Sequence, residues 1–189
     1  SATNFAFANT APPLGPAAPA AATGVDPSAS LSDVLALIQS ALIAQGPVAF
    51  EGFAHDSDPP AGKMSDWTYT KRIEYSDISL DPADCQLKFH FKLYVNGEVS
   101  DDKDAGVPLR DVSSIKVAPE VDLLQIRDAQ AGHPTYSSRL QPPIYDVDVV
   151  RGDGGVNEFS FYSLDTAHRL ANLFQAAAQR CGVTLVTTY

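Results

Sequence analysis

Apolar and polar residues alternate most regularly in the stretch CQLKFHFKLYV, residues 85–95. Cys85 and every second residue after it are apolar, and the residues between them are polar or amphipathic. A period of two is the spacing of side chains on one face of a β-strand. The stretch therefore predicts a long strand with one buried face and one face in water.

Six further segments combine apolar, aromatic and β-branched residues, a composition that favours strands. The sequence NGEVSDDKDAG, which follows residue 95, predicts a solvated hairpin loop because it is rich in turn-forming residues. The six predicted strands cover residues 47–54, 66–80, 112–119, 121–127, 144–150 and 157–163.

The sequence RGDGG, residues 151–155, lies between the last two of these strands. Its three glycines supply the positive φ angles that a hairpin turn needs. The same letters contain an RGD tripeptide, which is an adhesion signal in other proteins. The hairpin explains the sequence without a receptor, and we interpret it as a turn.

Two segments repeat apolar residues at helical spacing. SLSDVLALIQSALIAQG predicts a helix over residues 31–45, with Ser30 and Asp33 as a capping box and Gly46 as a stop signal. LDTAHRLANLFQAAAQRCG predicts a second helix near the C-terminus. Phe174 is the largest residue on its apolar stripe, which is otherwise made mainly of alanines, so this helix can lie close against a sheet.

Residues 1–29 differ in composition from the rest of the chain. They are mostly Ala, Pro, Thr and Gly, and such a segment cannot bury enough apolar surface to offset the entropy of ordering. We interpret them as a flexible Ala/Pro-rich spacer and residues 30–189 as a single globular domain. The expected fold class is α+β. It is mostly antiparallel β, in two packed sheets or a partly open barrel, capped by a C-terminal helix, with an additional N-terminal helix.

About seven strands followed by one helix resemble the pleckstrin-homology-like architecture, in which a C-terminal helix caps two packed antiparallel sheets. The resemblance covers about residues 47–182 and rests on the order of the elements alone. A lidded barrel and a cystatin-like α+β roll are alternatives. The family's lipid-binding members carry a basic cluster at the first hairpin. Here that hairpin, HDSDPPAGKMSD, is acidic apart from Lys63, so phosphoinositide binding is not implied.

The acidic composition excludes two classes of partner. Asp and Glu number 23 against 13 Lys and Arg, which gives a net charge of −10. Such a surface repels nucleic acid and anionic lipid heads. No apolar run approaches the length of a membrane span, so no transmembrane segment is expected. Because the chain starts at Ser1 rather than Met, we expect an exported protein, periplasmic or extracellular, whose N-terminal signal has been removed.

The two cysteines allow two interpretations. Cys85 begins the long predicted strand on its apolar face, and Cys181 ends the last predicted helix on its apolar stripe. They form a disulfide if that helix caps the sheets, which would indicate an oxidising compartment. The alternative is two separate buried thiols. We favour the disulfide.

Neither metals nor other cofactors are expected. The two cysteines and four histidines do not have ligand spacing, and the DDKDAG sequence fails as a calcium loop because residues without side-chain oxygens stand at ligand positions. Phosphate-binding glycine motifs and nucleophile motifs such as GxSxG are absent. Asp146 and Asp148 share one strand face, where they can serve acid–base chemistry. We interpret that face as the one in water, and an enzyme is less expected than a binding protein.

The segment of residues 128–143 is predicted as a long Pro-rich loop. It combines His133, Tyr136 and Arg139, residue types that are common on binding surfaces. The leading hypothesis is an exported, non-enzymatic domain that binds a protein or peptide through this loop or a sheet edge. The alternative is a small-ligand carrier or enzyme with a pocket between the sheets and the C-terminal helix.

Overall fold

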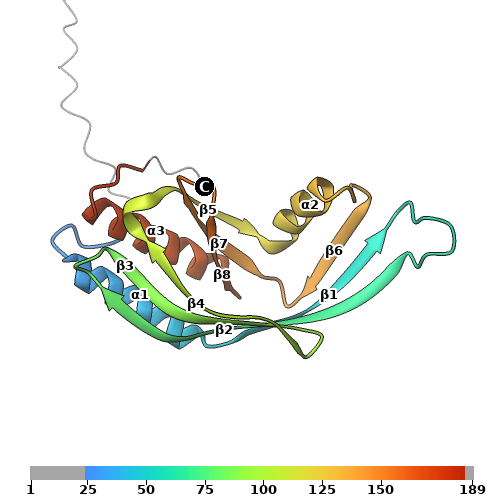
Figure 1. The fold of residues 1–189 in the computed structure, drawn as a ribbon, viewed down its shortest axis with the longest axis horizontal. Coiled ribbons are helices and arrows are strands. Elements are labelled where there is room, and N and C mark those ends of the chain that lie inside the picture. Colours follow the sequence, from blue (N-terminus) through green and yellow to red (C-terminus); the bar gives the residue numbers. More distant parts are fainter. Residues whose placement is uncertain (1–23, 186–189) are drawn as a thin grey trace, which may run out of the picture.

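The computed structural model describes residues 24–185, and these confirm the expected fold class. They form three helices and two antiparallel sheets, and within these residues the sheets do not close into a barrel. A long, curved five-stranded sheet runs along the molecule (Figure 1). The three-stranded sheet stands on its concave side, with a helix on either side of it (Figure 1).

The five-stranded sheet contains the longest strands of the chain. The burial of β1 alternates along its whole length, so one face of the sheet is buried and the other is in water. The long strand predicted from period-two alternation is β3 and is confirmed. The order of the strands is β4-β3-β2-β1-β6, with β1 Val48–Asp56, β2 Asp66–Asp81, β3 Gln86–Val95, β4 Glu98–Pro108 and β6 Tyr136–Gln141.

The three-stranded sheet has the order β5-β7-β8, with β5 Val112–Pro119, β7 Tyr145–Arg151 and β8 Val156–Phe161. A single 3-10 turn, η1 (Leu109–Asp111), leads into β5. The turn between β7 and β8 contains the RGDGG sequence, and Arg151 N donates to Gly155 O across it. The hairpin interpretation of this sequence is therefore confirmed, although of its three glycines only Gly154 has a positive φ angle.

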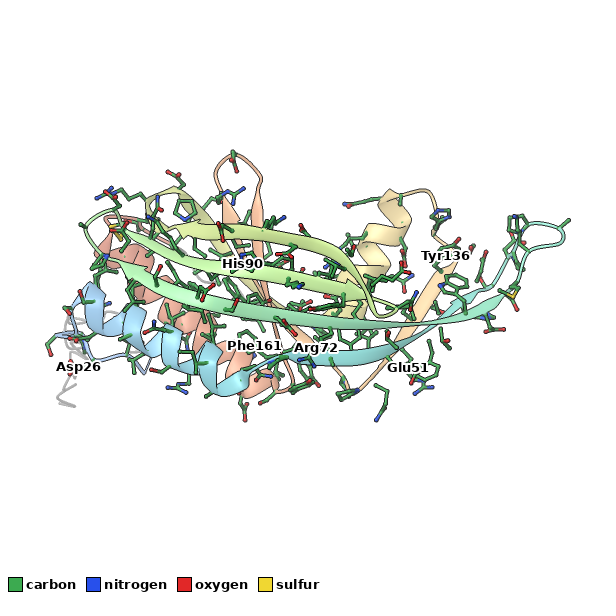
Figure 2. The ribbon with its side chains drawn as sticks, turned by 60° about the horizontal axis from the view of Figure 1, so that its bottom comes forward. Asp26, Glu51, Arg72, His90, Tyr136 and Phe161 are labelled. Atoms are coloured by element: carbon green, nitrogen blue, oxygen red, sulfur yellow. A yellow bond between two sulfur atoms is a disulfide. The ribbon has the colours of Figure 1, made fainter. Side chains whose placement is uncertain are left out.

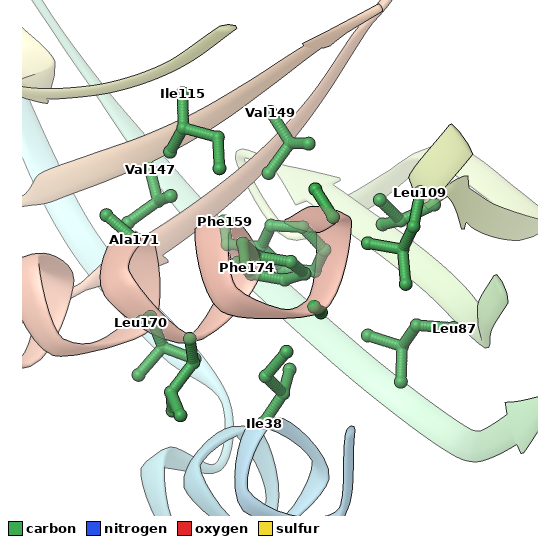
Figure 3. Packing of buried hydrophobic residues seen from close by; sticks show 14 of the residues in the cluster. Ile38, Leu87, Leu109, Ile115, Val147, Val149, Phe159, Leu170, Ala171 and Phe174 are labelled. Carbon is green, nitrogen blue, oxygen red and sulfur yellow. The ribbon is translucent and has the colours of Figure 1, made fainter. Parts of the chain in front are cut away.

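One helix packs on the apolar face of the three-stranded sheet, and a second helix packs against the first. α3 (Leu164–Arg180) contacts all three strands, and α1 (Leu31–Gln45) packs against α3 and β2. The predicted capping box at the start of α1 is present. The rings of Phe159 and Phe174 stack at the centre of this core, with centroids 5.0 Å apart, and aliphatic side chains from the surrounding elements enclose them (Figure 3).

The third helix, α2 (Glu120–Gln130), lies on the opposite side of the three-stranded sheet (Figure 1). Its residues Val121 and Leu124 pack on a second, smaller core formed with the five-stranded sheet. The strand predicted over residues 121–127 is therefore wrong. The loop predicted over residues 128–143 is also wrong, because the segment contains the end of α2 and strand β6.

The predicted hairpin loop after residue 95 is a third difference, because its SDDKDAG sequence lies in strand β4. Asp and Gly disfavour strands, but β3 offers a long row of backbone partners and basic side chains. His90 on β3 lies between Asp102 and Asp104, at 2.5 and 2.8 Å. Cross-strand pairing of this kind overrides local propensity.

Cys85 and Cys181 form a disulfide that joins the turn before β3 to the end of α3, with Cα atoms 6.0 Å apart. Of the predicted spacer, residues 1–23 lie outside the described residues. Residues 24–29 pack at the end of α3, where Arg180 donates to the carbonyl oxygens of Asp26 and Ala29. In the described part of the chain, no helix is long and apolar enough to cross a membrane.

Candidate functional site

The two faces of the three-stranded sheet have opposite chemistry. Val147 and Phe159 point to the α3 face and are fully buried. The other face carries Asp146 and Asp148 on β7, paired in register with Ser160 and Glu158 on β8. The sequence identified the two aspartates as sharing a face, but the prediction that this face is in water is wrong. Asp146 is 0% exposed.

Helix α2 covers this polar face and adds two charged residues to it. Glu120 begins the helix and is 4% exposed. Arg127 lies almost two turns later, where its Nη1 donates to Glu120 Oε1 at 3.3 Å and its Nη2 donates to Glu158 Oε2 at 2.8 Å. The guanidinium thus joins the helix to β8 across the polar face.

Four carboxyl groups therefore meet between α2 and the sheet: Glu120, Asp146, Asp148 and Glu158, here called the acidic cluster. Oxygens of Glu120, Asp146 and Glu158 lie within 4.8 Å of one another. Ser160 Oγ donates to Asp146 Oδ1 at 2.6 Å. By contrast, Glu120 Oε2, Asp146 Oδ2 and Asp148 Oδ1 are buried, and among the residues described no donor reaches them other than a proton held by the carboxyl groups themselves. A buried carboxylate oxygen without a hydrogen-bond partner destabilises the folded protein, because it has lost its hydration.

Burial makes Asp146, Asp148 and Glu158 hard to ionise. It raises the pKa of Asp146 to about 10, and a proton shared with Glu120 and the repulsion of Glu158 and Glu120 add to this rise. It also raises the pKa of Glu158 to about 8, where the repulsion of Glu120 adds to burial and Arg127 opposes it. The pKa of Asp148 is raised by burial as well. At neutral pH the cluster therefore holds protons that exposed carboxylates would have lost.

A cavity of about 160 Å³ lies between the sheets beside the acidic cluster. One wall is polar and consists of Glu120, Arg127, Glu158 and Ser160. The five-stranded sheet forms the rest, which is apolar apart from Lys71 and consists of Phe50, Ile73, Tyr75, Phe91 and Leu93. The cavity thus combines an apolar surface with a few convergent charged groups, as ligand sites do.

A larger hollow, of about 600 Å³, lies on the outer face of the five-stranded sheet. It contains Glu51 and Arg72, which lie on the outside of the sheet (Figure 2). It includes none of the buried carboxyl groups of the acidic cluster. We therefore assign the candidate site to the smaller cavity.

The three binding residues proposed from the sequence lie elsewhere, toward the end of the sheet far from α1, where Figure 2 labels Tyr136. The rings of His133 and Tyr136 stack with centroids 4.4 Å apart, and Trp67 meets Tyr136 edge-on at 4.9 Å. Arg139 points to the other face of the sheet, where its guanidinium lies 4.3 Å from the centre of the Phe53 ring. The structure thus brings two of the three residues together.

Sequence reasoning missed Glu120, Arg127 and Glu158. Glu120 and Arg127 were missed because α2 was read as a strand. A signal for the helix was present, since Pro119 is followed by acidic residues at positions 120 and 122, a pattern typical of a helix start. Glu158 was missed because a single carboxylate on a strand carries no signal until the sheet register is known.

Comparisons of the chain with protein families, with curated proteins and with solved structures found no match.

Proposed function

We propose that this chain is an exported binding domain that holds a small, positively charged ligand in the cavity between its sheets. One observation carries the proposal: Glu120, which lines this cavity, and Asp146, next to the cavity-lining Glu120 and Ser160, each keep a buried carboxyl oxygen that no N–H or hydroxyl group of the described residues pairs. Burying such groups costs free energy and does nothing for packing. A cationic ligand supplies the missing partner.

The size of the cavity limits the ligand. Drug-sized ligands occupy cavities of about 300–1,000 Å³, and this cavity has about half the volume of the lower limit. It suits a metal ion with its water molecules or an organic cation of a few heavy atoms. The apolar floor favours the same conclusion, because a low-polarity surrounding strengthens the attraction between the carboxylates and a cation.

Two further features support an exported binding domain. The Cys85–Cys181 disulfide is stable in an oxidising compartment. The order of strands and C-terminal helix is compatible with the pleckstrin-homology-like architecture, although an architecture does not fix a function.

Thermal unfolding in the presence of small charged molecules tests this proposal. Calcium, manganese and propylammonium ions are compared with propanol, a neutral analogue, and with acetate. At least one cation should raise the melting temperature of the wild type, because a ligand stabilises the state that it binds. The increase should disappear in Glu120→Gln and persist in Asp122→Asn, which removes an exposed carboxylate from the same helix. Equal increases in the two variants would reject the cavity as the site.

A second candidate function follows from the position of β6. This strand is an edge of the five-stranded sheet, and Tyr136 and Arg139 lie on it. An edge strand can pair with an extended peptide, as expected from the sequence. Selection of displayed peptides tests this function. Peptides whose binding is lost in Tyr136→Ala and kept in Glu120→Gln would support it, and the opposite pattern would assign them to the cavity.

A further inference from the structure

We infer that the ligand is a hard divalent cation, bound by the carboxylates of Glu120, Asp146 and Glu158. This inference rests on the proposed function, since it names the class of ligand for the same cavity. The three residues come from α2, β7 and β8, so the site exists only in the folded protein.

The spacing of the oxygens fits one ion. One oxygen from each of the three residues can be chosen so that all lie within 4.8 Å of one another. Oxygens on opposite sides of a calcium ion lie about 4.6–5.2 Å apart, because each bond is about 2.3–2.6 Å long. Carboxylate oxygens select calcium, magnesium or manganese over the softer metals, which prefer sulfur and nitrogen.

All three carboxyl groups are held through one oxygen, and two of them, Asp146 and Glu120, keep the other oxygen unpaired. Ser160 holds Asp146 through Oδ1, which leaves Oδ2 unpaired. Arg127 holds Glu120 through Oε1, which leaves Oε2 unpaired, and holds Glu158 through Oε2. Neighbours that fix one oxygen of a metal-binding carboxylate orient the other one, which is how metal sites in proteins are supported. Ser160 and Arg127 are therefore positioning residues.

The charges of the site favour a divalent ion. Arg127 and Lys116 act on the acidic cluster and offset two of its four charges. Lys71 lies at the edge of the cavity, where its ammonium group is 5.7 Å from the centre of the Tyr69 ring. With all four carboxyl groups ionised, the cluster has an excess of negative charge, which one small divalent ion can offset from a single position as it displaces the protons that Asp146 and Glu158 hold at neutral pH.

The remaining coordination positions can be filled by water. A water molecule occupies about 30 Å³ in the liquid, so a cavity of about 160 Å³ has room for several beside the ion. Hard divalent cations keep part of their water shell when only a few carboxylates bind them.

Calorimetric titration of the full chain, freed of metal with a chelator, tests the inference at about pH 8, where competition from protons is reduced. Calcium and manganese chlorides are the probes. We expect one ion per chain, and at least about a tenfold loss of affinity in Glu120→Gln and in Asp146→Asn. Asp122→Asn should bind as the wild type does, and circular dichroism verifies that each variant is folded. Ser160→Ala should weaken binding by a smaller factor, because it removes only a positioning hydrogen bond.

The outcomes separate this inference from the proposed function. Binding of propylammonium without binding of either metal would overturn the divalent cation and leave the proposed function standing. The absence of binding by any of the three cations would reject both. Metal binding of equal affinity in Glu120→Gln and wild type would place the ion outside the acidic cluster and overturn the inference.

Discussion

The two faces of the three-stranded sheet differ although a helix covers each of them. Under α3, the side chains of Val147, Val149 and Phe159 are fully buried and pack as a uniform apolar core. Under α2, the same strands present Asp146, Asp148 and Glu158. Successive side chains of one strand point to opposite faces of the sheet. The two faces therefore belong to the same backbone, with the same strand register, and differ only in their side chains.

The residues on the α3 face stabilise the fold, and the carboxyl groups on the α2 face do not. Burial of apolar side chains stabilises the folded chain, whereas burial of unpaired carboxyl groups destabilises it. Mutations on the α3 face should therefore cost stability and spare cation binding. Mutations of the acidic cluster should do the reverse.

The largest effect is expected from Phe174→Ala on the α3 face. Its ring is fully buried against Phe159, and truncation leaves a cavity that the alanines beside it on α3 cannot fill. The free energy of unfolding should fall by about 3–5 kcal/mol, measured from the urea midpoint. A change below about 1 kcal/mol would mean that α3 does not anchor the core.

Reduction of the Cys85–Cys181 disulfide should have the next largest effect. The bond closes a loop with a sequence separation of 96 residues, and such bonds typically contribute about 2–4 kcal/mol. The urea midpoint should fall on reduction, while the cation affinity stays within about twofold, because the bond lies on the α3 side of the molecule. Titration of two reactive thiols in denatured, unreduced protein would contradict the bond itself.

On the acidic face, Asp146→Asn should stabilise the metal-free protein. The pKa of Asp146 is raised to about 10 by folding, so the folded chain binds a proton that the unfolded chain has released above about pH 4. Stability therefore falls as the pH rises from about 4 toward 10, and Glu158 adds to the decline up to about pH 8. Asn removes the Asp146 part of this decline.

We expect a gain of about 1–3 kcal/mol for Asp146→Asn at about pH 8, and a smaller gain at about pH 5. The pKa of His90 is also raised, by Asp104 and Asp102, which contributes in the same direction. Since the variant leaves His90 unchanged, the difference between variant and wild type reports on Asp146. A gain that does not grow with pH would contradict the assigned cause.

The smallest effect concerns Gln175, a polar exception on the otherwise apolar side of the sheet. It is buried, and its Oε1 has no hydrogen-bond partner within residues 24–185. Gln175→Met keeps the length of the side chain and removes the unpaired oxygen, so stability should change by less than about 1 kcal/mol, toward a gain. Calorimetry should find the cation affinity unchanged. A loss of affinity would show that the two faces are coupled.

Local patterns were enough to predict most of this architecture, since of the helices and strands described only α2, β4 and β6 were missed. The alternation from Cys85 to Val95 predicted β3, the capping box at Ser30 predicted the start of α1, and glycines predicted the hairpin after Arg151. In each case, the residues that determine the element lie within it. The disulfide could also be predicted. Cys85 lies on the apolar side of its predicted strand and Cys181 on the apolar side of its predicted helix, so both cysteines were expected to face the core.

The other elements depend on partners that are distant in the sequence. β4 is a strand because β3 lies beside it, although its own residues favour a turn. The short α2 mixes polar and apolar residues without a clear period. Without that helix, nothing was expected to cover the sheet face that carries Asp146 and Asp148. The sequence therefore predicted a solvent-exposed face where the structure has a buried cluster. The acidic site could not be predicted from its own residues, because it forms where a helix covers a sheet.

The most direct test of the acidic site is the anomalous scattering of manganese in crystals of the full chain. We expect a single strong peak beside α2, with manganese–oxygen distances of about 2.0–2.6 Å to Glu120, Asp146 and Glu158. Soaked crystals of the Glu120→Gln variant should lose this peak. Manganese bound elsewhere, with Glu120 and Asp146 still sharing a proton, would contradict a metal site in the acidic cluster.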